Sequence, residues 1–157
     1  MTIRTQFAGL ILIAGSLLLP TLAASQTTAT EHDKSIDIST GDHVKVQQIL
    51  LALQRAVAKH DVAAVAALIR YPLRVNPGKR PFTVKSPKAF IARYDEIITP
   101  DVTSAIFKQK YENLFANSEG VMIGDGEVWI TSSCLDKNCR QTDIKVGTIQ
   151  DTKNLKP

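Results

Sequence analysis

The alternation of apolar and polar residues is clearest between residues 120 and 149. A short apolar run leads into a Gly-Asp-Gly turn at residues 124–126, and a second run resumes after it. Further on, apolar and polar residues alternate with a period of two, with Ile144, Val146 and Thr148 on one face. This pattern predicts a three-strand meander with one buried face, which the preceding helices must cover.

Helical periodicity dominates the chain before the meander. Asp42 and Asp61 are each placed to cap a helix, and the second of these helices is short and rich in alanine. Ser86 and Thr99 each precede a proline, a typical helix start, and the first of these two helices is expected to run to Ile98. The helix after Asp42 has a single apolar stripe, formed by Val46, Ile49, Leu50, Leu53 and Val57.

A second region of strand periodicity lies between the helices, at residues 69–76. Pro72 lacks a backbone N–H donor, which predicts that this strand lies at a sheet edge or next to a bulge. Residues 82–84 are expected to return as a short strand after a turn. Together the patterns predict a single α+β domain over residues 42–150, with helices packed on a curved antiparallel sheet and residues 151–157 as a C-terminal tail.

The N-terminal residues have the character of a targeting signal. Arg4 precedes an apolar stretch at residues 7–19, which is shorter than the roughly 20 residues of a spanning helix. We therefore predict a cleaved signal peptide at residues 1–24, an exported protein of the periplasm or exterior, and no membrane anchor in the mature chain. Residues 25–41 are polar and rich in Thr and Ser, which predicts a flexible tether.

The chain has two cysteines, Cys134 and Cys139, which flank a four-residue turn. In an exported protein such a pair predicts a disulfide across the hairpin, contributing roughly 2 kcal/mol for so short a loop. The alternative is half of a Cys-x4-Cys metal site, but no other cysteine exists to complete it. We predict neither a metal nor a cofactor.

Charge is distributed unevenly along the chain. The formal net charge is only +4, yet residues 62–94 contain no acidic residue and seven basic ones. If these fold next to each other, they form a positive surface that can attract an acidic protein or an anionic envelope component; the alternative is a solvated face that maintains solubility. Nucleic acid is not expected as a partner, given export. The predicted basic surface comprises Arg70, Arg74, Lys79, Arg80, Lys85, Lys88 and Arg93.

The order of elements resembles the nuclear transport factor 2-like superfamily, in which a bent sheet wraps helices into a cone with a pocket. The chain is similar to small exported bacterial members without an assigned activity. The residues that carry the resemblance are Phe90, Tyr94, Asp95, Ile97, Thr99, Pro100 and Val102, then Leu114 and Phe115, then Gly120, Val121, Met122, Ile123, Gly124, Gly126, Val128, Trp129 and Ile130.

Enzymes of this superfamily, such as ketosteroid isomerases, place acids, histidines or tyrosines inside the cone, which here leaves Tyr94, Asp95 and Asp125 as weak catalytic candidates. The histidines do not follow that pattern. Trp129 is expected either to pack in the sheet or to anchor a partner. The aromatic residues that could surround an apolar pocket are Tyr71, Phe90, Tyr94, Tyr111, Phe115 and Trp129.

The sequence favours a non-enzymatic binding protein that recognises a protein partner or an anionic envelope component, with an inhibitor or immunity protein as a specific case. Two alternatives stay open, a small pocket enzyme of the isomerase, cyclase or dehydratase kind and a passive envelope protein. The chain could also pair with a second copy of itself. A cone filled by its own side chains would favour the binding protein.

Overall fold

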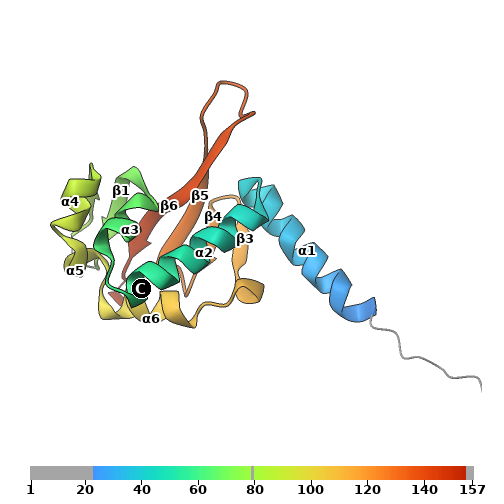
Figure 1. Ribbon diagram of the computed structural model, residues 1–157, viewed down its shortest axis with the longest axis horizontal. Helices are drawn as coiled ribbons and strands as arrows, with labels where there is room; N and C mark the ends of the chain where they lie inside the picture. Colours follow the sequence, from blue (N-terminus) through green and yellow to red (C-terminus); the bar gives the residue numbers. More distant parts are fainter. Residues whose placement is uncertain (1–22, 79, 155–157) are drawn as a thin grey trace, which may run out of the picture.

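The computed structural model describes residues 23–78 and 80–154, so the predicted signal peptide lies almost wholly outside the described part. The chain has an α+β fold in which helices pack against one open, six-stranded mixed sheet with the strand order β2-β1-β6-β5-β4-β3 (Figure 1). The strands are β1 (Ile69–Asn76), β2 (Phe82–Val84), β3 (Phe115–Asn117), β4 (Gly120–Ile123), β5 (Val128–Cys134) and β6 (Thr142–Gln150).

The predicted meander is present and begins one strand earlier than expected, because β3 pairs with β4. Gly124 and Gly126 both have positive φ in the turn before β5, as the residue types suggested. Cys134 and Cys139 form the predicted disulfide, with their Cα atoms 4.6 Å apart, at the tip of the β5–β6 hairpin. In Figure 1 this hairpin extends well beyond the rest of the sheet.

The sheet is mixed, whereas the sequence predicted an antiparallel one. β1 and β6 run parallel, with Arg74 opposite Thr148 and Asn76 opposite Gln150. The chain leaves β1 through the β2 hairpin and several helices, and it returns through the meander to join β1 from the other side. Such a connection is long enough to allow either direction, and local periodicity carries no information about it.

The alternation predicted for the last strand fails at one residue. Ile144 and Val146 are buried as expected, but Ile149 is buried in place of Thr148. The register shifts here, since Trp129 pairs with Thr148 while the next residue, Ile130, pairs with Val146. Gly147 forms this bulge, and a Cβ atom there would lie 2.4 Å from Thr131 Oγ1, so a larger residue would have to displace the Thr131 side chain.

Pro72 does not mark a sheet edge, because β1 lies between β2 and β6. The alternative prediction is confirmed, since the β1–β6 register shifts between Ile69 and Arg74. Pro72 lies inside this irregular stretch, where the pairing of β1 with β6 does not require a backbone N–H donor. The peptide bond before Pro72 is cis.

The helices are α1 (Ala23–Thr40), α2 (His43–Ala58), α3 (Val62–Ala67), α4 (Pro87–Ile91), α5 (Tyr94–Ile97) and α6 (Pro100–Lys108), with short 3₁₀ turns η1 (Tyr111–Asn113) and η2 (Thr152–Asn154). The predicted caps are confirmed: Asp42 accepts from Lys45 N, Asp61 from Ala64 N, and Thr99 from Val102 N. The whole stripe predicted for α2 is buried, and α2 crosses in front of the sheet in Figure 1.

Two predictions about helices differ from the structure. The helix expected to run to Ile98 is split into α4 and α5 at Arg93, whose backbone leaves the helical region (φ −125°, ψ 21°). The segment predicted as a flexible tether forms helix α1. Its last turns pack on the body, because Ile36 is fully buried and Ser39 Oγ donates to the Asn117 carbonyl oxygen at 2.7 Å.

The core lies between the helices and one face of the sheet, here called the inner face. It is filled with aliphatic side chains, and Leu73, Val128 and Ile130 are all completely buried. Because side chains alternate along each strand, the intervening residues point to the opposite, outer face. The outer face therefore carries the residues of the sheet that are free to meet a partner.

Candidate functional site

One row of side chains crosses the outer face from edge to edge, and we call it the outer row. Each member pairs directly with the next across neighbouring strands, which places their Cβ atoms about 5 Å apart. One half of the row is polar, with Thr83 and Arg74 exposed, and the other half is apolar, ending in a side chain that is 53% exposed. In order from β2 to β3 the outer row is Thr83, Arg74, Thr148, Trp129, Met122 and Phe115.

A hollow of about 280 Å³ opens at the middle of the outer row. Arg74 and Trp129 stand on either side of Thr148, which pairs with both of them. Apart from the indole, every side chain around the hollow is polar. They are Arg74, Asn76, Glu119, Trp129, Thr131, Thr148 and Gln150.

Arg74 is exposed, and no hydrogen bond or ion pair joins its guanidinium to another residue in the described ranges. On its other side lies a second hollow, of about 300 Å³, lined by Pro72, Pro81, Phe82 and Thr83 as well as Arg74. An Arg side chain in this position keeps all five donors available for a ligand. Arg74 is thus the residue of the predicted basic surface that is best placed to bind.

Arg70 also lies on the outer face, but its guanidinium is engaged within the protein. Nη1 donates to Thr131 Oγ1 at 2.7 Å, and Nη2 donates to the carbonyl oxygens of Thr131, at 2.8 Å, and Asp143. Burial lowers the pKa of Arg70 from its ordinary value, and the nearby Asp143 opposes this effect. Arg70 therefore joins β1 to the hairpin strands and is not part of a free basic surface.

The other basic residues of the predicted surface differ in whether they contact other side chains. Arg93 lies 3.5 Å from the centre of the Phe82 ring and forms an ion pair with Glu96 at 2.7 Å. The hydrogen bonds that Arg93 donates to the Glu96 carboxylate raise the pKa of Arg93. Lys79 lies outside the described residues. The remaining members, Arg80, Lys85 and Lys88, are exposed.

The aromatic residues predicted to surround one pocket lie in separate places. Phe90 and Tyr94 pack edge to face in the core, with their ring centroids 5.9 Å apart. Tyr71 is half-buried and donates to the Ala66 carbonyl oxygen at 3.1 Å, and burial raises its pKa to about 12. Phe115 and Trp129 belong to the outer row. Tyr111 belongs to a separate polar cluster at α1.

The weak catalytic candidates do not converge. Tyr94 is buried beside His60 and Phe90, and its hydroxyl has no hydrogen-bond partner among the described residues. Burial raises its pKa. Asp95 follows it on α5 and is exposed, while Asp125 is exposed in the β4–β5 turn and lines a hollow that includes neither Tyr94 nor Asp95. This arrangement assembles no acid–base pair.

Asp125 borders the largest of these hollows, about 440 Å³, between α6, the β4–β5 turn and η2. Glu127 is the residue there that sequence reasoning missed, and it is 8% exposed. Its carboxylate accepts the Asp125 backbone N–H at 2.7 Å and the Thr152 hydroxyl. Lys153 pairs with Asp101 across the same region. In these contacts the polar groups bind each other. They also attach η2, which lies in the predicted tail, to the domain.

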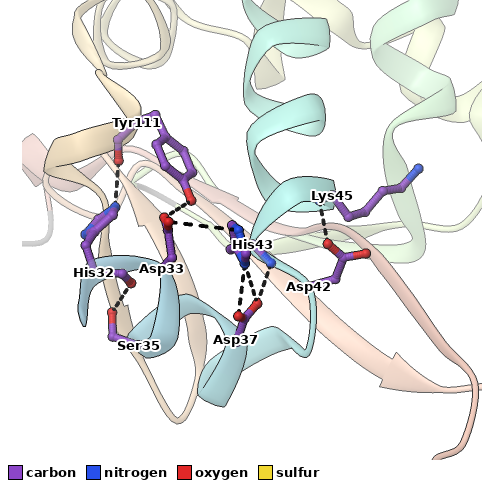
Figure 2. Close-up of polar contacts among 8 residues, drawn as sticks. All are labelled: His32, Asp33, Ser35, Asp37, Asp42, His43, Lys45 and Tyr111. Carbon is purple, nitrogen blue, oxygen red and sulfur yellow. Dashed lines mark hydrogen bonds and ion pairs between the residues drawn. The ribbon is translucent and has the colours of Figure 1, made fainter. Parts of the chain in front are cut away.

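A polar cluster fastens α1 to the body, and sequence reasoning missed it because the segment had the composition of a tether (Figure 2). His43 Nδ1 lies 2.9 Å from both carboxylate oxygens of Asp37, and its Nε2 lies 3.9 Å from Asp33. The Tyr111 hydroxyl donates to Asp33 at 2.6 Å, and His32 Nε2 lies 3.0 Å from the Tyr111 carbonyl oxygen.

The charges in this α1 cluster stabilise each other. The hydrogen bond with Asp37 raises the pKa of His43, and the His43 backbone N–H holds the pKa of Asp37 below its usual range. Burial, followed by the bond to Asp33, raises the pKa of Tyr111. Across residues 23–78 and 80–154 no group of three His, Cys, Asp or Glu side chains is arranged to hold a metal ion.

Comparison with protein families, curated proteins and solved structures found no match of any of the three kinds. Within the part of the chain that the structure describes, no helix is both long enough and apolar enough to cross a membrane.

Proposed function

We propose that this chain is an exported, non-enzymatic binding protein that recognises an anionic component of the cell envelope through the outer face of its sheet. The observation that carries the proposal is Arg74. Its guanidinium is exposed and free of partners among the described residues, it lies between two hollows, and Trp129 is close by in the outer row. Arg and Trp are the side chains that most often dominate binding energies.

Two further features support this proposal. The inner face, where an enzyme of the resembled superfamily would have its pocket, is packed with aliphatic side chains such as Val146 and Ile130. The Cys134–Cys139 disulfide is typical of proteins that work in an oxidising compartment such as the periplasm. Membership of the nuclear transport factor 2-like superfamily, with a cone-like sheet, is part of the proposal; helices stacked on one face of an α+β sheet support it.

A protein partner is the second candidate, and the apolar half of the outer row favours it. Phe115, Met122 and Trp129 lie side by side on three neighbouring strands, and Phe115 is 53% exposed. Exposed aromatic side chains in a contiguous row are more common at protein interfaces than elsewhere on a surface. A second copy of the chain could also occupy this half of the face.

Co-sedimentation with isolated Gram-negative cell envelopes tests the proposal. We expect the wild-type protein to bind at low salt and to be released at high salt, because an exposed charge is screened. Arg74→Glu should weaken binding about tenfold or more, equivalent to about 1.4 kcal/mol.

Arg55→Glu is the matched control, since Arg55 is exposed on α2, on the side of the helices, and its reversal changes the net charge equally. Thermal unfolding should show that both variants fold like the wild type. Equal binding by Arg74→Glu and the wild type, or an equal loss in both variants, would disprove the proposal. Specific capture of an envelope protein that depends on Phe115 would favour the second candidate.

A further inference from the structure

The hollow beside Arg74 has a defined width. Arg74 on β1 and Trp129 on β5 are separated only by β6, so their Cα atoms lie two strand spacings apart, about 10 Å. Thr148 forms the floor between them. This span accommodates a single six-membered ring with its substituents, placed between the guanidinium and the indole.

Trp129 lies at one edge of the hollow. Gly126 lies next to it, and a Cβ atom at Gly126 would lie 3.6 Å from Trp129 Nε1, 3.7 Å from Met122 Sδ and 3.5 Å from Gln150 Nε2. The indole nitrogen, the Met122 thioether and the Gln150 amide thus surround the space beside Gly126, and the indole remains partly exposed. A partly exposed indole on the outer face of a sheet is a stacking surface for a ring that has C–H groups on its face.

The polar groups of the hollow keep unused donors and acceptors. Gln150 Nε2 donates to the Gly126 carbonyl oxygen at 2.8 Å, and Asn76 Oδ1 accepts from Gly78 N at 3.2 Å. The opposite end of each amide, and the side chains of Thr148 and Glu119, form no hydrogen bond within the described residues. Ligand hydroxyls both donate and accept, so they match such a mixed set.

The charges select among anionic ligands. Arg74 can bind a carboxylate, sulfate or phosphate through two parallel hydrogen bonds. Glu119 borders the same hollow and repels additional negative charge. The hollow thus suits a ligand with one acidic group and several hydroxyls, in contrast to a nucleotide or a dense phospholipid surface. Its only large apolar side chain is Trp129, which is too little for an apolar peptide anchor.

We infer that the hollow between Arg74 and Trp129 is a binding site for an acidic sugar unit, in which Arg74 binds the acid group, Trp129 stacks on the ring, and Asn76, Thr148 and Gln150 bind hydroxyls. This inference rests on the proposed function and names the ligand class for the same face. It makes the envelope component an acidic glycan.

The single tryptophan of the chain makes the test direct. The probes are uronic acid, sulfated and phosphorylated oligosaccharides, each paired with its neutral counterpart, titrated while Trp129 fluorescence is recorded and repeated by calorimetry. We expect at least one acidic probe to change the fluorescence and to bind about tenfold more tightly than its neutral counterpart, a difference of one charge-assisted contact.

The variants assign the contacts. Arg74→Gln should reduce binding of the acidic probe to the level of the neutral one, and Trp129→Phe, followed by calorimetry, should weaken both. Arg80→Gln is the matched control, since Arg80 is exposed on the basic side but lines neither hollow, and it should bind like the wild type.

Three results would overturn the inference. These are no binding of any acidic oligosaccharide, equal binding of acidic and neutral probes, or tighter Arg74-dependent binding of adenosine monophosphate or phosphatidylglycerol vesicles. If envelope sedimentation still depended on Arg74 in any of these cases, the proposed function would stand and only the ligand class would be wrong. If substitution of Arg74 changed neither oligosaccharide binding nor envelope sedimentation, both proposals would be disproved.

Discussion

Tyr94 and Tyr71 differ in whether the hydroxyl has a partner. Tyr94 is 6% exposed and its buried hydroxyl has no partner among the described residues, whereas the Tyr71 hydroxyl donates to the Ala66 carbonyl oxygen. A buried polar group without a hydrogen bond costs free energy, so Tyr94→Phe should raise the free energy of unfolding by about 1 kcal/mol. Tyr71→Phe, the matched control, should lower it by about 1 kcal/mol.

Urea denaturation followed by circular dichroism measures both changes. A loss of stability in Tyr94→Phe would mean that the hydroxyl is hydrogen-bonded and would reopen Tyr94 as a site residue. At this scale the sequence predicted the strand at residues 69–76, but it could not separate Arg70 from Arg74. Both lie at polar positions of the same alternation, and only the tertiary positions of Thr131 and Asp143 engage one of them.

Helix α1 is the element whose stability should depend most on pH. The His43 pKa is raised above its ordinary 6.5. The contribution of protonated His43 to stability is therefore complete below pH 6.5 and is lost as pH rises through the folded-state pKa. The Asp37 pKa is lowered from 3.8, so its contribution is present above 3.8 and is lost as pH falls through the lower value. The α1 cluster is therefore strongest between these two ordinary values.

Hydrogen exchange measures this dependence at the amides of α1. After correction for intrinsic rates, protection near Ile36 and Asp37 should decrease from pH 6 to pH 8, and His43→Gln should abolish the decrease. Asp61→Asn, which alters a cap outside the cluster, should leave the pH dependence unchanged. Unchanged protection in the wild type across this range would show that the cluster does not hold α1.

Helices α1 and α2 show which kind of element could be predicted from the sequence. For α2, a stripe of buried aliphatic residues with a capping Asp42 was enough, because the information is local. For α1, only Ile36 and Thr40 are buried in the part whose side chains are described, and the helix is held by contacts to Asn117 and Tyr111. Those partners lie about 80 residues away, so composition indicated a tether.

At the scale of the whole molecule, charge is distributed between two ends. The end formed by β1, β2 and α4 comes from the segment without acidic residues, and it lies opposite α1 in Figure 1. The end around α1, η1 and the β3–β4 turn carries several acids beside its basic residues. These acids are Glu31, Asp33, Asp37, Asp42, Glu112 and Glu119. The small net charge of +4 does not reveal this asymmetry. The order of charges along the sequence suggested it, and in the fold the acid-poor segment forms one end of the molecule.

The asymmetry predicts a difference between two variants of equal net charge. Arg80→Glu with Lys85→Glu reverses two exposed charges at the acid-poor end, and Lys34→Glu with Lys45→Glu reverses two exposed charges at the α1 end. An anionic matrix should hold the wild type by the acid-poor end, because nearby acids weaken the field at the other. On a sulfonate cation exchanger at pH 7, the first variant should therefore elute at clearly lower salt than the second. Equal elution would mean that the basic residues act only through net charge, and the orientation of this molecule toward an anionic envelope would then depend on Arg74 alone.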